Sequence, residues 1–187
     1  MEKLKKEHKK EIKEFVNQKR LIRRLWNIDE ELSELIFMLI LCRKPEFILE
    51  IGTSNGYSTF WLSLAAEEIK GVVHTIEVDK KRYELACDNL INRKNVILHH
   101  AKAEVILPEF DHSIDFLFID AGKPGYIDYL KLVEEKLSDS AIIVADNIVS
   151  HPETTASFRE YLKDSDSYIS TILNYKSGLQ IAYYKGK

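Results

Sequence analysis

The sequence lacks the features that identify several large classes of protein. It has only two cysteines, Cys42 and Cys87, and neither has a Cys or His partner at metal-ligand spacing, so we expect no zinc site. Its longest apolar stretch, from Leu35 to Cys42, is far shorter than the roughly 20 residues that cross a bilayer. The charged N-terminus is not followed by the apolar segment of a secretory signal. We therefore expect a cytoplasmic protein without membrane contact, in which both cysteines are reduced core residues.

One catalytic motif is also missing. There is no P-loop, which argues against a P-loop NTPase. What is present is ordinary for a soluble globular protein: 187 residues, 45% hydrophobic and 30% charged, enough for one domain with a substantial core.

The net charge of −3 is unevenly distributed. Residues 1–24 hold ten Lys or Arg and four Asp or Glu, so this segment carries +6 and the rest of the chain −9. A basic arm of this kind can contact nucleic acid. It can equally be a solvated helix, because its Lys and Glu residues alternate at helical spacing, and we favour that interpretation.

The hydrophobic pattern changes at residue 46. Before it, the spacing of apolar residues predicts two helices, 3–25 and 29–41, the second capped by Asn27 or Asp29. After it, short apolar strands alternate with helices, which predicts a doubly wound α/β fold whose sheet is mostly parallel. A hairpin across residues 176–178 adds an antiparallel C-terminal strand. The expected strands are 47–51, 72–77, 95–99, 114–120, 141–145, 168–174 and 179–184, and the expected helices between them run to about residue 69, from Asp79, and over 103–107, 124–137 and 152–163. The domains implied are an N-terminal helical extension, 1–45, and an α/β domain, 46–187.

The polar residues with possible chemistry follow the strands directly. Ligands of open α/β sheets bind at the carboxyl ends of the strands. Gly52 and Gly56 follow the first strand, where glycine lets the backbone approach a ligand closely, although a plain turn would have the same sequence. Their G-x-x-x-G spacing disfavours a dinucleotide-binding oxidoreductase. Glu77 ends the second strand, where an acidic residue can bind ribose hydroxyls, so a nucleoside-bearing cofactor is favoured.

Three oxygen-bearing residues follow two strands that should be neighbours. Asp120 ends one strand, and Asp146 and Asn147 end the next. Two carboxylates and an amide suit Mg²⁺ or another hard divalent cation, although the two Asp residues could instead cap helices. Lys123 can act as a base beside such a cation, or be an exposed loop lysine. For His151 a surface-loop position is preferred to a contact with substrate.

Taken together, three segments resemble one family. The E-I-G-x-x-x-G-Y-S turn (50–58), the I-D-A-x-K-x-x-Y segment (119–126) and A-D-N (145–147) occur here in the same order as in the catechol O-methyltransferase-like, class I S-adenosylmethionine-dependent methyltransferases. The resemblance covers roughly residues 46–187. It implies a Rossmann-like, seven-stranded sheet and a cytoplasmic enzyme, with a homodimer as the expected assembly. Ala101-Lys102-Ala103 and the short connection after Asn147 depart from the family pattern and imply an open acceptor side.

The resemblance also implies a role for each site residue. Asp120, Asp146 and Asn147 would hold Mg²⁺ or another hard divalent cation, and Lys123 would take the proton of the acceptor hydroxyl. Glu77 would bind the ribose, and the backbone of Ala103 with the side chain of Glu104 would meet the adenine. The other residues expected at the S-adenosylmethionine site are Glu50, Gly52, Ser54, Gly56, Ser58 and Asp120.

The function that follows is a metal-assisted O-methyltransferase that uses S-adenosylmethionine. Its acceptor would be a catechol-like or other small hydroxylated molecule. One alternative is a tRNA O-methyltransferase acting on a wobble hydroxyuridine, whose binding would weaken steeply with salt. Another is a non-catalytic cofactor-binding protein on the same fold, because fold alone does not settle function.

Overall fold

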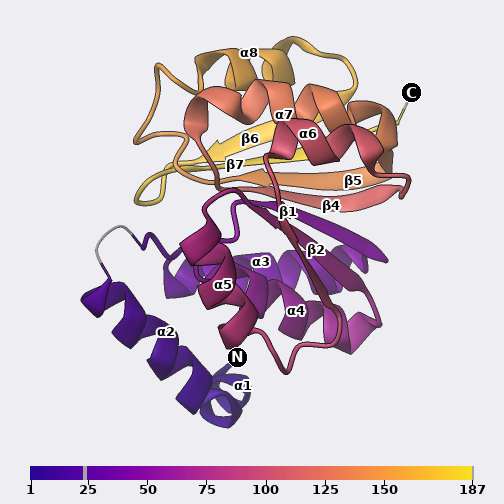
Figure 1. The fold of residues 1–187 in the computed structure, drawn as a ribbon. Coiled ribbons are helices and arrows are strands. Elements are labelled where there is room, and N and C mark those ends of the chain that lie inside the picture. Colours follow the sequence, from indigo (N-terminus) through magenta and orange to yellow (C-terminus); the bar gives the residue numbers. More distant parts are fainter. Residues whose placement is uncertain (23–24, 187) are drawn as a thin grey trace.

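A seven-stranded sheet forms the centre of the protein, in the strand order β3-β2-β1-β4-β5-β7-β6. The computed structural model describes residues 1–22 and 25–186 (Figure 1). Pairing is parallel from β3 to β5 and antiparallel for β5–β7 and β7–β6, as the sequence predicts. The strands are β1 (Phe47–Ile51), β2 (Val72–Glu77), β3 (Val96–His100), β4 (Ile114–Ile119), β5 (Leu137–Ala145), β6 (Tyr168–Leu173) and β7 (Leu179–Tyr184).

Helices cover both faces of this sheet, so the predicted doubly wound α/β class is confirmed. One face carries α3 (Glu30–Arg43), α4 (Tyr57–Ile69) and α5 (Lys80–Asn89), and the other carries α6 (Ala103–Ile106), α7 (Tyr126–Val133) and α8 (Ala156–Asp164) (Figure 1). Each face has its own cluster of buried apolar side chains. Among the described residues, no helix has the length and apolar content needed to cross a membrane.

The N-terminal region packs outside α3, α4 and α5 as α1 (Glu2–Glu7) and α2 (Lys9–Leu21). Phe15 is its buried anchor, with ring centroids 5.5 Å from Tyr57 and 5.4 Å from Phe60. Lys5 forms ion pairs with Glu30 and Glu34 of α3. The extension therefore docks through both apolar and charged contacts.

Several predicted boundaries differ from the structure. The single helix expected over 3–25 is two helices that meet at His8, whose ring packs against Phe60 at 5.6 Å; the second ends at Leu21, and residues 23–24 lie outside the described part. Val16 and Ile22, expected on the apolar stripe, are 38% and 41% exposed. The cap of α3 is Asp29, which accepts a hydrogen bond from the backbone N–H of Leu32.

The largest difference lies between β4 and β5. The helix expected over 124–137 is split into a 3₁₀ turn (Lys123–Gly125), α7 and a second 3₁₀ turn (Glu134–Lys136), after which β5 begins at Leu137. The strand is longer than predicted because Leu137 pairs with Ile114 across an irregularity in the register. Helix α8 begins only at Ala156. The residues before it form turns, in which the Thr155 hydroxyl donates to the carbonyls of Ile148 and His151.

The two cysteines do not share one environment. Both are free, but Cys42 is exposed and Cys87 is half-buried. The expectation that both belong to the core is wrong for Cys42, because the buried face of α3 is formed by other residues, among them Ile36 and Ile40.

Three histidines lie close together: His74 of β2, His99 of β3 and His112, which precedes β4. His74 Nδ1 lies 3.0 Å from His99 Nε2, and the His74 ring packs 4.5 Å from Phe47 and 5.8 Å from His112. Burial, and then the neighbouring His99 and His112, lower the pKa of His74 to about 4. His74 is therefore neutral in the folded protein at neutral pH.

The lowered pKa of His74 predicts that the free energy of unfolding decreases in acid. The unfolded chain binds a proton at the ordinary imidazole pKa of ~6.5, whereas folded His74 binds it only near pH 4, so stability is lost as the pH falls through that window. We expect His74→Gln to flatten the pH dependence of the unfolding free energy there, by at most ~1.4 kcal/mol per pH unit. Urea denaturation at several pH values measures it, with exposed His100→Gln as the control; equal slopes in His74→Gln and the parent protein would contradict the assignment.

Candidate active site

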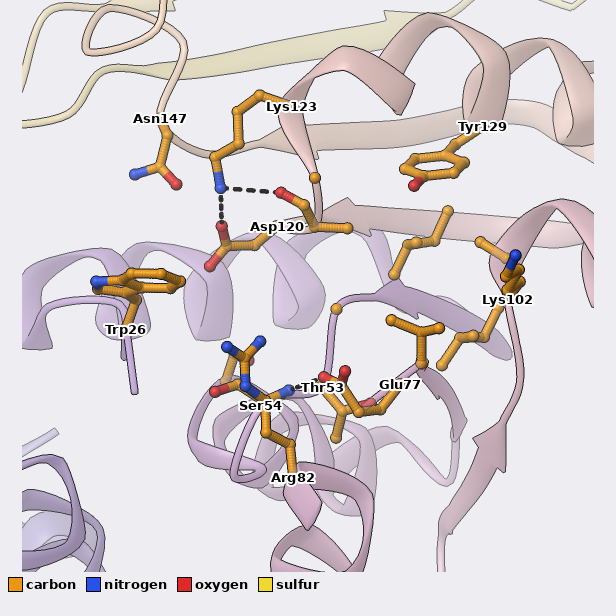
Figure 2. A pocket seen from close by; sticks show the side chains of 18 of the residues that line it. Trp26, Thr53, Ser54, Glu77, Arg82, Lys102, Asp120, Lys123, Tyr129 and Asn147 are labelled. Carbon is orange, nitrogen blue, oxygen red and sulfur yellow. Dashed lines mark hydrogen bonds and ion pairs between the residues drawn. The ribbon is translucent and has the colours of Figure 1, made fainter. Parts of the chain in front are cut away.

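One large cavity, of about 800 Å³, opens at the carboxyl ends of β1, β2 and β4 (Figure 2). It extends from Glu77 and Glu104 at one end to Lys123 and Asn147 at the other. The residues that line it and were expected at the site are Gly52, Ser54, Ser58, Glu77, Ala103, Glu104, Asp120, Lys123 and Asn147. The parallel sheet thus brings together residues that are up to 95 positions apart, because its strands end at one edge.

The turn after β1 has an unusual backbone. Gly52, Ser54 and Gly56 have φ values of +106°, +53° and +88°, a region that glycine enters easily and serine does not. The Gly52 and Thr53 N–H groups both donate to the carbonyl of Ile76, at 3.0 and 3.2 Å. The turn is therefore fastened to β2, and its backbone faces the cavity.

Glu77 is held by that same turn. Its Oε2 accepts the Ser54 N–H at 2.8 Å, and its Oε1 accepts the Asp79 N–H at 2.8 Å. Both oxygens are therefore fixed in orientation at the wall of the cavity, and the side chain is only 5% exposed. A carboxylate fixed in this way is a ready acceptor for ligand hydroxyl groups.

Two of the predicted cofactor residues do not line the cavity. Glu50 is completely buried beneath the turn, where the hydroxyls of Thr59 and Thr75 donate to its Oε2. Burial, augmented by the Asp120 carboxylate, raises the pKa of Glu50 to about 7. Gly56 is needed for a different contact: a Cβ there would meet the Leu90 side chain, so this glycine lets α5 approach the turn.

The opposite end of the cavity is acidic and holds a lysine. Lys123 Nζ lies 3.0 Å from Asp120 Oδ1 and 3.0 Å from the carbonyl of Ala121, and points between Asp120 and Asn147 (Figure 2). Asp146, predicted as a third metal ligand, is not among the residues that line the cavity. It is 6% exposed, and its Oδ1 accepts hydrogen bonds from Asn147 N–H and Ser177 Oγ. Burial, together with the Asp120 carboxylate, raises the pKa of Asp146 to about 6.

The donor set at this end suits a hard divalent cation. It combines two carboxylates that repel each other with the amide of Asn147, whose φ of +63° sets its position at the end of β5. In the described part of the chain, no group of three His, Cys, Asp or Glu side chains is placed to hold a metal ion. A cation here would thus depend on the Asn147 amide as its third protein ligand, in addition to water.

Several cavity residues were not singled out from the sequence. Trp26 is 69% exposed at the mouth, and the Arg82 guanidinium lies 5.7 Å from its ring. Tyr129 and Lys102 also line the wall, and His151, expected on a surface loop, is exposed and at the same time borders the cavity. Neither periodicity nor a motif identifies Trp26, Arg82 and Tyr129, because tertiary packing alone brings them to the site.

Fold and cavity together define a doubly wound α/β protein of the class I methyltransferase type. A family model described as a methyltransferase domain matches residues 49–148, just over half of the chain, and the chain belongs to that family. The predicted resemblance is thereby confirmed at the level of the family.

Known relatives agree with this assignment. The chain is 35% identical over 116 residues to a catechol O-methyltransferase of Niastella koreensis, covering 58% of this chain and 52% of that protein. It is 28% identical over 156 residues to a caffeoyl-CoA O-methyltransferase of Medicago sativa, covering 74% of this chain and 62% of that protein. The chain thus matches between half and two thirds of the length of these relatives.

Solved structures share the fold. The O-methyltransferase TomG from Streptomyces achromogenes, in complex with SAM, superposes with a TM-score of 0.85 at 24% identity, covering 95% of this chain and 90% of that one. An O-methyltransferase from Bacillus cereus, in complex with SAH, gives 0.82 at 22% identity, covering 94% and 90%. At these identities the likeness establishes the fold.

The surroundings of Gly52 and Gly122 predict that an alanine substitution destabilises the protein at the first position and not at the second. Any side chain at Gly52 would clash with the backbone carbonyl of Asp120 and would be strained at φ +106°, whereas a Cβ at Gly122 meets nothing within 4 Å. We expect Gly52→Ala to lower the unfolding free energy by about 2–4 kcal/mol and Gly122→Ala to leave it within about 1 kcal/mol. Urea denaturation of both variants tests this, and similar midpoints would show that the approach of β1 to β4 is not tight.

Proposed function

We propose that this chain is an S-adenosylmethionine-dependent, divalent-metal-assisted O-methyltransferase acting on a catechol-like or other small hydroxylated acceptor. One observation carries the proposal: a single cavity joins the fixed Glu77 carboxylate to the Asp120, Lys123 and Asn147 cluster. The family and the named relatives support the reaction type. In this proposal residues 46–187 form the cofactor-binding domain and 1–45 its helical extension. The homodimer and the cytoplasmic location expected from the sequence stay predictions.

The cofactor belongs to the Glu77 half of the cavity. Both Glu77 oxygens are oriented by backbone N–H groups, and their remaining lone pairs suit the two ribose hydroxyls. Ala103 and Glu104, at the start of α6, line the adjacent wall and would meet the adenine. Gly52, Ser54 and Ser58 would border the methionine end, above the buried Glu50. Gly56 would contribute indirectly, through the shape of the turn.

The acceptor belongs to the other half. Asp120, Asp146 and Asn147 would hold a divalent cation, which would act as a Lewis acid and lower the pKa of an acceptor hydroxyl. S-adenosylmethionine supplies the electrophilic methyl group. Positioning of the hydroxyl against that methyl group would account for much of the rate.

Lys123 is the group of this chain that would accept the hydroxyl proton. Its Nζ lies at the cavity wall, 3.0 Å from Asp120 Oδ1, beside the proposed cation site. The neutral amine of a lysine is the form that acts as a base. Asp120 would serve the cation as a ligand and the base by holding its position.

Two alternatives share the same fold. The basic residues of α1 and α2 favour a tRNA hydroxyuridine as acceptor, since Lys and Arg would contact phosphates. A cofactor-binding protein without transfer activity is the second alternative, and the acidic cluster with Lys123 argues against it. Transfer to bulk tRNA that falls steeply with salt would support the first.

The metal requirement gives the first prediction for activity. We expect methyl transfer from labelled S-adenosylmethionine to a simple catechol with Mg²⁺, and none with a chelator. Asp120→Asn removes one ligand charge and should lower transfer by about 100-fold, while Asp128→Asn on the exposed side of α7 should not change it. Transfer that persists in the chelator would disprove metal assistance, and no transfer despite cofactor binding would redirect the search to tRNA.

A second prediction separates the base from the charge of Lys123. Lys123→Arg keeps a cation beside Asp120 but cannot become neutral, because the guanidinium pKa is above ~12. We expect transfer to fall by about 100-fold or more, while binding of S-adenosylhomocysteine by calorimetry stays close to that of the parent. Lys131→Arg, exposed on α7, is the matched control. Full activity in Lys123→Arg would remove the proposed proton acceptor.

A further inference from the structure

Three side-chain amides join the N-terminal extension to the turn after β1. Gln18 of α2 and Asn89 of α5 exchange two hydrogen bonds: Gln18 Nε2 donates to Asn89 Oδ1 at 2.8 Å, and Asn89 Nδ2 donates to Gln18 Oε1 at 2.8 Å. Asn55 Nδ2, within the turn, donates to the same Gln18 Oε1 at 3.1 Å. Segments that are 34 to 71 residues apart in the sequence thus meet in one network.

The network also holds the backbone of the turn. Asn89 Nδ2 donates its second hydrogen to the carbonyl of Asn55, at 2.8 Å. Asn55 stands between Ser54 and Gly56, both of which have positive φ. A serine in that conformation persists only where the surrounding structure stabilises it. In this turn, Asn55 is the residue that forms hydrogen bonds with the side chains of Gln18 and Asn89.

Because Asn55 is buried, losing one of these hydrogen bonds would cost free energy. The Asn55 side chain is completely buried, and its Oδ1 already has no hydrogen-bond partner among the described residues. Without Gln18 Oε1, the Asn55 Nδ2 group would lose that acceptor while its side chain stays buried. A buried amide in that state is costly, so the turn would relax toward another conformation.

The amide contact can be separated from the docking of α2. Phe15, 2% exposed, seats the helix against Tyr57 and Phe60 through apolar contacts one turn away from Gln18. Substitution of Gln18 therefore removes the hydrogen bond to Asn55 and leaves the apolar contacts of Phe15 in place.

We infer that Gln18 is a positioning residue of the proposed cofactor site: through Asn55 it holds the turn in the conformation that receives the methionine end of S-adenosylmethionine. The inference rests on the proposed function, in which this turn borders the cofactor. Asn55, Ser54 and Tyr57 all line the cavity, so a change in the turn changes its wall. A preformed turn spares the ordering cost that binding would otherwise include.

The test uses the full chain and the variant Gln18→Leu, which keeps the bulk and removes both amide functions. We expect calorimetry to give a Kd for S-adenosylhomocysteine about tenfold higher than that of the parent. We also expect faster amide hydrogen exchange in a peptide spanning residues 52–57 of the ligand-free protein, with exchange in β4 and β5 unchanged. Gln18→Glu, which retains acceptor oxygens for Asn55, should fall between Gln18→Leu and the parent in both measurements.

Glu14→Leu, on the exposed side of α2, controls for an apolar substitution in the same helix and should match the parent. An unchanged Kd together with unchanged exchange over residues 52–57 in Gln18→Leu would overturn the inference, as would equal effects from Glu14→Leu. If Gln18→Leu does not fold, Gln18→Glu carries the comparison. Failure of the parent to bind S-adenosylhomocysteine would instead refute the proposed function, and the exchange data would still decide whether Gln18 holds the turn.

Discussion

The close approach of the Gly52 backbone to that of Asp120 is the constraint on which the site depends. The Asp120 N–H donates to the Ile51 carbonyl at 2.9 Å, and a Cβ at Gly52 would collide with the Asp120 carbonyl. The turn after β1 and the acidic residue after β4 therefore share one wall of the cavity. Because neighbouring parallel strands end together, this contact joins the two halves of the site, the fixed Glu77 carboxylate and the Lys123 cluster.

Three carboxyl groups lie near this junction, and a bound cation would reduce the repulsion between them. Glu50, Asp120 and Asp146 lie close enough that the charge of Asp120 raises the pKa of both other carboxyl groups, in addition to the effect of burial. Lys123 forms an ion pair with Asp120 at 3.0 Å, and its charge opposes the upward pKa shift of Asp146 without cancelling it. Carboxyl groups with shifted pKa values beside a cavity are typical of a functional site rather than of a core built for stability.

The sequence predicts most of the sheet and many of the cavity residues for one physical reason. Strand periodicity locates the strand ends, and the parallel order places Gly52, Glu77 and Asp120 at one edge. Prediction from the sequence fails where contacts between distant segments determine the position of a side chain. The Glu50 side chain points beneath the turn, because alternate residues of a strand face opposite sides, and Trp26 and Arg82 reach the cavity mouth through contacts between segments that no local pattern encodes. The break in the N-terminal helix at residue 8 is missed for the same reason, because His8 packs against Phe60 of α4.

The N-terminal extension illustrates how far such contacts reach. Its composition alone suggests a solvated basic helix, and most of its charged side chains are indeed exposed. Yet Phe15 packs against Tyr57 and Gln18 bonds Asn55, and both of these partners line the cavity. An apolar anchor fixes where the helix lies, and a directional amide contact fixes the conformation of what it touches, because hydrogen bonds depend on angle and apolar contacts do not. The described part of the extension therefore acts on the turn through uncharged side chains, Phe15 and Gln18, while the strands position that turn from the other side.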